Sequence, residues 1–111
     1  MVGGLEVQRS PSDVRVLVAP VELGLDTRLE FRCEALKCIE SIPRGAGRLV
    51  IDVTATRSVD STGLGVLFMV RRRAAQRRLH VVLRGVSEEL RFLLVLTKLE
   101  DLFEIEMAPT G

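Results

Sequence analysis

The apolar positions in the first third of the chain predict two strands followed by a helix. Two short apolar stretches, residues 5–8 and 14–19, flank a turn-forming Ser-Pro-Ser-Asp segment, and we expect an antiparallel hairpin. Asp26 and Thr27 can then cap a helix that runs to about Ile42. Its expected buried face carries residues at the spacing i, i+4, i+7 and i+10, namely Leu29, Cys33, Leu36 and Ile39.

Strands and helices alternate through the rest of the chain. The continuous apolar, β-branched run at residues 49–53 predicts a central strand, and a polar turn then starts a helix over residues 60–76. Another strand is predicted at residues 79–83, and a short strand or extended tail at residues 103–105. Between them, Ser87 and the two acids after it open a third helix. Its inward positions are Leu90, Leu93, Leu94 and Leu96.

Strands that alternate with helices imply crossover connections and mostly parallel pairing. We therefore predict one α/β domain over residues 1–111, with about four or five strands in a mixed sheet and about three helices mainly on one face. A chain of 111 residues, 47% of them apolar, can form one core without disulfides or metal. Cys33 and Cys38 would point about 140° apart on the predicted helix, so we expect free thiols in a reducing compartment.

Several classes of function find no support in the sequence. No secretory signal is visible, and the longest apolar runs, such as residues 66–70, are too short to cross a bilayer, so we expect a cytoplasmic protein without membrane insertion. There is no Walker loop, no G-x-G-x-x-G fingerprint and no metal-ligand spacing around His80. Ser61 also lacks the G-x-S-x-G context of a hydrolase. We therefore expect neither an enzyme nor a bound cofactor or metal.

Arginines gather at the end of the helix predicted over residues 60–76. They are Arg71, Arg72, Arg73, Arg77 and Arg78. The cluster suits the negative end of a helix dipole, and it could also steer an acidic protein partner. The net charge of +1 and the lack of Trp and Tyr argue against direct binding of nucleic acid, because no aromatic platform accompanies the arginines.

The most informative segment is the polar turn that follows the strand at residues 49–53. It reads Asp60-Ser61-Thr62-Gly63-Leu64-Gly65. Glycine in a helix interior costs about 1 kcal/mol relative to alanine, so the two glycines indicate close backbone approach or tight packing. Asp60 and Ser61 are also ordinary helix caps, and capping alone is the alternative interpretation.

This segment resembles the signature of the STAS domain, the fold of anti-sigma-factor antagonists, over about residues 48–105 and more loosely over 14–47. The resemblance implies a partner switch. The unphosphorylated antagonist binds an anti-sigma factor that is also a serine kinase of the histidine-kinase-like ATPase type, and sigma-factor-dependent transcription follows. Phosphorylation of the serine after the motif aspartate, here Ser61, ends the interaction, and a serine phosphatase restores it. Thr62 is the competing phosphorylation site.

The same resemblance implies a surface that binds the partner. Its expected residues are Asp60, Ser61, Thr62, Gly63, Leu64, Gly65 and Met69. A phosphate there adds about −1.5 to −2 charges beside Asp60, which opposes docking by repulsion and desolvation. We expect Leu64, Leu67 and Phe68 to face the sheet and Val66, Met69 and Val70 to extend the apolar stripe sideways. Met69 then either packs in the core or forms the apolar centre of the interface.

The chain departs from the family pattern at three places. Gly24 stands where many antagonists have an acid near the phosphorylated serine, Ser58 stands where an aromatic residue is common, and Arg77-Arg78 replace Gly-Gly. These departures leave two other roles open. One is a constitutive STAS binding subunit, for example the accessory protein of a lipid transporter, and the other is a scaffold subunit of a stress-sensing assembly.

Overall fold

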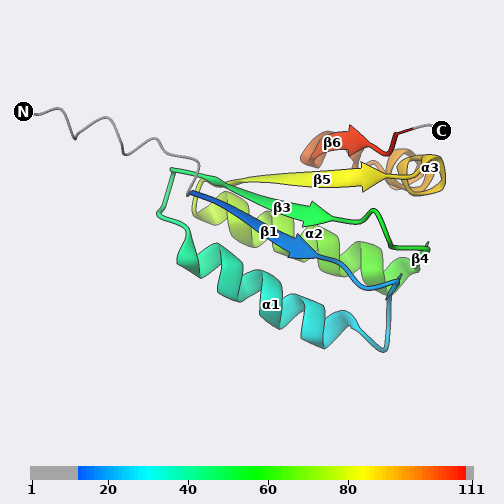
Figure 1. Ribbon diagram of the computed structural model, residues 1–111, viewed down its shortest axis with the longest axis horizontal. Coiled ribbons are helices and arrows are strands. Elements are labelled where there is room, and N and C mark those ends of the chain that lie inside the picture. Colours follow the sequence, from blue (N-terminus) through cyan, green and yellow to red (C-terminus); the bar gives the residue numbers. More distant parts are fainter. Residues whose placement is uncertain (1–12, 110–111) are drawn as a thin grey trace, which may run out of the picture.

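Parallel strands form the main sheet of the protein, whose computed structural model describes residues 13–109 (Figure 1). They lie in the order β1 (Val14–Val18), β3 (Arg48–Asp52), β5 (His80–Val86) and β6 (Glu104–Met107). Every neighbouring pair is parallel, so after each strand the chain crosses back to the end of the sheet where that strand began. The helices are α1 (Arg28–Ser41), α2 (Ser61–Gln76) and α3 (Glu88–Leu96), followed by the 3-10 turn η3 (Glu100–Leu102). The predicted α/β architecture with three helices is confirmed.

The hydrophobic core lies between the sheet and the helices. Parallel register places Leu17, Ile51, Leu83 and Ile105 in one row across the four strands. Ile51 and Leu83 belong to the same hydrophobic cluster as the buried residues of α1 and α2, and Leu17 and Ile105 pack against it. The two helices lie along one face of the sheet in Figure 1. Leu90 and Leu94 of α3 join this cluster. The burial of one continuous cluster explains why the fold needs no disulfide, and both cysteines are free.

The opposite face of the sheet carries both apolar and charged side chains. On β1 it presents Val14, Val16 and Val18, all of them exposed. Farther across, Arg48 of β3 reaches past β5 to lie 3.5 Å from Glu104 of β6, and Arg84 of β5 lies 3.3 Å from Glu106 on the neighbouring strand β6. Alternation of side chains along each strand separates this face from the core.

The helix predicted from Asp26 onward is present as α1, but its buried face differs from the prediction. Phe31, Ala35 and Ile39 are buried, whereas Leu29 is 62% exposed and Cys33 is also exposed. The spacing i, i+4, i+8 brings the large Phe31 ring into the core, and Ile42, just past the helix end, continues the same face. The prediction was wrong for Leu29 and Cys33, whereas Leu36 is half-buried against the core and Ile39 is buried as expected.

The helices α2 and α3 follow the predictions closely, with two corrections. Leu64 and Leu67 are buried as expected, and so are Val66 and Val70, but Phe68 does not face the sheet and is 41% exposed. In α3, the buried leucines are Leu90 and Leu94, while Leu93 is half-buried and Leu96 is 60% exposed. A spacing of four residues keeps Leu90 and Leu94 on one line, and Leu96 falls away from it.

The structure adds a second, two-stranded sheet that the sequence pattern did not reveal. In it, β2 (Glu22–Leu23) pairs parallel with β4 (Ser58–Val59). The predicted strand at residues 14–19 is β1, but its expected antiparallel partner at residues 5–8 lies outside the described residues. All strand pairs formed within residues 13–109 are parallel, so the antiparallel part of the predicted mixed sheet rests on that segment.

Candidate functional site

The motif segment begins at the end of β4, where the chain leaves the small β2–β4 sheet and enters α2. This point lies beyond the carboxyl ends of β1 and β3 (Figure 1). Strand β4 is held by the loop before β2, because the Arg57 N–H donates to the Val21 carbonyl at 2.7 Å. The Asp60 N–H in turn donates to the Leu23 carbonyl at 3.3 Å. These bonds fix the entry of the chain into α2 against the loop that leads to α1.

Asp60 is the N-cap residue of α2. Its backbone is extended, and its carboxylate Oδ1 accepts a hydrogen bond from the Gly63 N–H at 2.8 Å. Its carbonyl accepts the first helical bond, from the Leu64 N–H at 2.9 Å. Asp60 therefore caps α2, and its carboxylate also lies at the positive end of the helix dipole.

The two motif glycines have different surroundings. A Cβ atom on Gly63 would collide with the backbone carbonyl oxygen of Leu23, so only glycine lets the start of α2 lie so close to β2. A Cβ on Gly65 would meet nothing within 4 Å. Close packing against Leu23 thus explains why residue 63 is glycine, whereas Gly65 faces open space.

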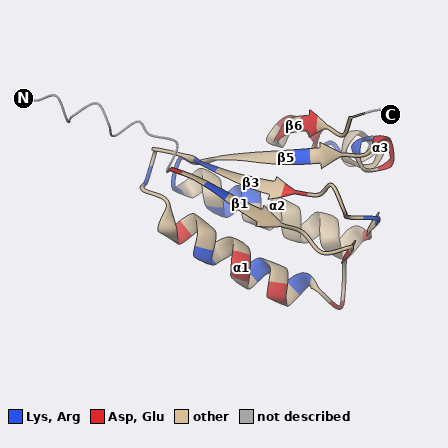
Figure 2. Cartoon of the chain, viewed as in Figure 1, with Lys and Arg blue, Asp and Glu red and all other residues tan. Residues whose placement is uncertain are grey.

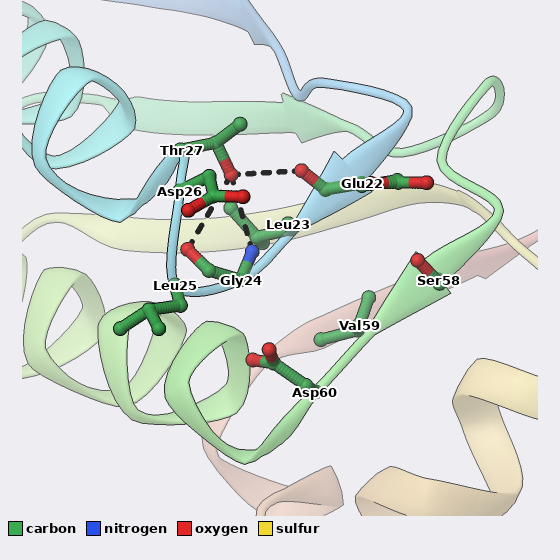
Figure 3. A pocket seen from close by; sticks show the side chains of 9 residues that line it. All are labelled: Glu22, Leu23, Gly24, Leu25, Asp26, Thr27, Ser58, Val59 and Asp60. Carbon is green, nitrogen blue, oxygen red and sulfur yellow. Dashed lines mark hydrogen bonds between the residues drawn. The ribbon is translucent and has the colours of Figure 1, made fainter.

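Gly24 is buried directly against the motif aspartate. A side chain at residue 24 would collide with the carboxylate of Asp60. The Gly24 N–H is held in place by the Thr27 hydroxyl, which accepts from it at 3.1 Å and donates to the Glu22 carbonyl at 2.7 Å. Thr27 is the N-cap residue of α1, but its side chain makes no cap bond and instead braces this loop, as Figure 3 shows.

A small acidic pocket lies between the β2–α1 loop and β4. Its volume is about 250 Å³, and the side chains of Glu22, Asp26 and Asp60 line it together with Ser58 (Figure 3). No Lys or Arg is among its lining residues. The pocket therefore repels anions, and it adjoins the residue that opens α2.

The hydroxyl groups of the motif differ in access. Ser61, the first residue of α2, is exposed, and Thr62 is partly buried in a groove against α1. His80 starts β5 at the other end of the sheet, beyond the whole length of α2, which is about 24 Å at 1.5 Å per residue. Ser61 and His80 therefore cannot form a nucleophile–base pair.

The remaining predicted partner-binding residues divide by burial. Asp60, Ser61 and Gly65 are exposed, and Thr62 and Met69 are half-buried. Gly63 and Leu64 are buried, so they shape the surface from beneath it. Leu29, Arg28 and Arg32 of α1, which sequence reasoning did not connect with the motif, line the same groove as Thr62 and Met69.

The arginine cluster lies at the far end of α2 from Ser61, and two of its members are tied inward. The Nε of Arg71 donates to the Leu102 carbonyl at 3.0 Å, and the Nη2 of Arg77 donates to the Ile42 carbonyl at 3.0 Å. Arg72, Arg73 and Arg78 are exposed. Two arginines of the cluster thus hold neighbouring loops through hydrogen bonds, which the sequence alone does not show.

Two further observations apply to residues 13–109. None of their helices combines the length and the apolar character needed to cross a membrane. Within the same residues, no group of three or more His, Cys, Asp or Glu side chains is arranged to hold a metal ion.

Structural comparison shows the same fold in two proteins of low sequence identity. The crystal structure of TM1081 from Thermotoga maritima, a proposed anti-sigma factor antagonist, superposes with a TM-score of 0.72 and 21% identity over 85% of this chain and 79% of that one. The NMR structure of TM1081 gives a TM-score of 0.71 at 21% identity, covering 86% of this chain and 75% of that one.

A sulfate transporter family protein from Wolinella succinogenes is nearly as similar. Its crystal structure gives a TM-score of 0.70 at 18% identity, and the match covers 87% of this chain and 80% of that one. A search among curated proteins finds no match. The STAS domain family model, however, matches residues 8–110, which include every described element from β1 to β6. The chain therefore belongs to the STAS domain family.

Proposed function

We propose that this protein is an anti-sigma-factor antagonist that binds a kinase-type anti-sigma factor and is released when Ser61 is phosphorylated. The observation that carries the proposal is the position of Ser61, an exposed hydroxyl on the first residue of α2 beside the capping carboxylate of Asp60. A kinase can reach it without any rearrangement of the fold. Domains of this family are typically binding modules rather than enzymes, and the structural likeness to a proposed antagonist agrees with that role.

The electrostatics of the site support release by phosphate. Asp60 already places one negative charge at the start of α2, and the acidic pocket adds Glu22 and Asp26 nearby. A phosphate on Ser61 adds about −1.5 to −2 further charges at pH 7. If the repulsion and desolvation remove about 3 kcal/mol from the binding free energy, affinity falls by about a hundredfold. No refolding is required for such a switch.

A second function rests on Gly24. The acid expected near the phosphorylated serine is absent, and the space it would need is filled by the Asp60 carboxylate. A constitutive STAS subunit, which packs on an ATPase or transporter without being phosphorylated, needs no such acid. The likeness to a sulfate transporter family protein also agrees with this alternative. A scaffold role in a stress-sensing assembly would require a multimer, so light scattering on the purified chain separates that role from the other two.

The deciding experiment is phosphopeptide mass spectrometry on the protein from its native cells. Trypsin releases the peptide from Ser58 to Arg71, which contains Ser58, Ser61 and Thr62, so fragmentation has to separate the three hydroxyls. We expect phosphate on Ser61 under at least one growth or stress condition. Phosphate on Thr62 would keep the switch and move its site, whereas a well-covered peptide without phosphate would favour the constitutive subunit.

A matched set of variants tests the consequence for binding. Tagged wild type, Ser61→Ala and Ser61→Asp are expressed in the native cells, and the captured kinase-type anti-sigma factor and its phosphatase are quantified. We expect Ser61→Ala to retain the kinase and Ser61→Asp to lose most of it. Ser58→Ala is the control, because it removes an exposed hydroxyl that lies outside the expected partner-binding residues. Equal capture by all variants would contradict the electrostatic release.

A further inference from the structure

The groove between α1 and α2 opens on the same side of the molecule as Ser61. Its walls include Arg28, Leu29 and Arg32 from α1 and Thr62, Gly65 and Met69 from α2, and its volume is about 450 Å³. Both helices lead from the carboxyl end of one parallel strand to the amino end of the next, so they run in the same direction. The groove therefore runs along both helices.

Gly65 leaves the middle of this groove bare. It lies one helical turn after Ser61 and one turn before Met69 on α2. Neither of the usual reasons for glycine applies, since its φ is not positive and a Cβ would meet no described atom within 4 Å. Glycine at such a position costs about 1 kcal/mol relative to alanine. The packing of residues 13–109 thus does not explain Gly65.

The first half of α1 presents opposite charges on its two flanks. Arg28 and Arg32, four residues apart, line the groove against α2, where no carboxylate is among the lining residues. Glu30 and Glu34 line the opposite flank, against β1. Figure 2 shows these alternating charges along α1. None of the side-chain ion pairs within residues 13–109 involves Arg28 or Arg32, so both cations are available to an anionic occupant.

Apolar side chains lie between these charges. Leu29 is 62% exposed although it is a large aliphatic residue, and Met69 across the groove is half-buried. Exposed apolar surface beside a charged rim is typical of a surface that binds another protein. The occupant must therefore offer carboxylates together with at least one apolar side chain.

We propose that the α1–α2 groove binds an acidic amphipathic helix of the partner protein. Docking places an apolar side chain over Gly65, between Leu29 and Met69, while carboxylates on either side pair with Arg28 and Arg32 in the helix-in-groove mode. This inference rests on the proposed binding function and names the chemistry of the partner. It also explains how phosphorylation would weaken binding. Ser61 lies one turn from Gly65, so a phosphate on Ser61 repels the carboxylates of the docking helix.

A titration with synthetic helices tests the groove without the kinase or the native partner. Amide shifts of isotope-labelled protein are followed while a peptide of about 20 residues, helical and with one Leu-rich face and one Glu-rich face, is added to about 1 mM. The matched control peptide has Lys in place of every Glu. We expect saturable shifts at Leu29, Arg32, Gly65 and Met69 with the acidic peptide only. Absence of shifts, equal binding of the basic peptide, or shifts centred on Arg72 and Arg78 would overturn the proposal.

Variants of the two walls provide the second readout. Gly65→Phe plugs the groove and the double change Arg28→Glu with Arg32→Glu reverses its charge, and we expect each to weaken acidic-peptide binding at least tenfold. Arg72→Glu is the matched control, because this exposed arginine lies outside the groove, and it should bind within twofold of wild type, with thermal melts confirming that all variants fold. Failure here leaves the Ser61 phosphopeptide result untouched, and an unphosphorylated Ser61 leaves the peptide result untouched, so the two proposals fail separately.

Discussion

The carboxylate of Asp60 fills the space that a side chain at residue 24 would need, so Gly24 and Asp60 are matched to each other across the gap between the β2–α1 loop and α2. A Cβ on Gly24 would lie within 3 Å of the Asp60 carboxyl carbon, at 2.8 Å. The same carboxylate accepts the capping bond from the Gly63 N–H. The capping bond of Asp60 and the glycine at residue 24 therefore depend on each other, and a substitution at either position should alter the packing of the other.

Gly24→Ala tests this dependence. The new methyl group has to displace the Asp60 carboxylate from its capping position, and loss of an N-cap typically costs about 1 kcal/mol. We expect chemical denaturation to show a free energy of unfolding lower by about 1–2 kcal/mol. Gly24→Asp should be more destabilising at low salt than at high salt, because it adds like charge beside Asp60.

A double-mutant cycle provides the control for Gly24→Ala. In a background of Asp60→Ser, the shorter capping side chain leaves room for the methyl group, so Gly24→Ala should cost much less there than in the wild type. Equal costs in both backgrounds would show that the two residues are not coupled.

The two motif glycines should respond oppositely to alanine. Gly63→Ala forces a methyl group against the Leu23 carbonyl oxygen, which is backbone and cannot easily move, and we expect a loss of about 1–3 kcal/mol. Gly65→Ala enters open space and removes a flexible residue from a helix, so a gain of up to about 1 kcal/mol is expected. Thermal or chemical denaturation of the two single variants checks the prediction. Comparable losses in both would mean that Gly65 also has a packing role.

The sequence was sufficient to predict most of the fold because its elements have strong local signals. Asp60 and Ser87 mark the starts of α2 and α3 as capping residues, and both side chains accept the expected bonds. The face of α1 was predicted wrongly because Leu29 and Phe31 begin two overlapping apolar stripes, and only packing against the sheet decides which is buried. The two-residue strands β2 and β4 are too short to leave a pattern in the sequence.

The candidate site was predictable only in part, for a related reason. The motif itself located Ser61 and its neighbours, since they are consecutive in the chain. Arg28 and Arg32 join them only in three dimensions, across the interface between α1 and α2, so no spacing in the sequence connects them with the motif. The sequence also did not show which arginines of the cluster are structural. Arg71 and Arg77 looked like part of a solvated patch, but their side chains donate to backbone carbonyls.

Replacing two arginines of that cluster should separate structure from surface charge. Arg77→Ala removes the donor to the Ile42 carbonyl and loosens the loop after α1, where the Gly45 N–H also donates to the Arg77 carbonyl at 2.8 Å. We expect a loss of about 1–3 kcal/mol of stability in chemical denaturation. Arg72→Ala removes the same charge from an exposed position and should stay within about 0.5 kcal/mol of wild type. A large loss for Arg72→Ala would mean that this exposed residue is also structural.

Asp52, at the end of β3, gives the stability of the fold a predictable dependence on acid. Hydrogen bonds from Thr54, including the backbone N–H at 2.9 Å from Oδ1, lower the pKa of the Asp52 carboxyl, and the Arg84 charge lowers it further. A carboxyl whose pKa is lower in the folded state stabilises the fold above the unfolded value of about 3.9 and loses that contribution as the pH falls through the folded value.

The variant Asp52→Asn tests this acid dependence, because it keeps an acceptor for the Thr54 N–H but has no proton to bind. Unfolding midpoints of wild type and variant are compared at a series of pH values from about 6 down to about 3. The wild type should be the more stable protein at the upper end, and the difference should shrink as the pH falls, since protonation of Asp52 removes the charge that its neighbours stabilise. Parallel curves would mean that Thr54 and Arg84 bind the neutral and the ionised carboxyl equally well, and the hydrogen bonds at the end of β3 would then be independent of charge.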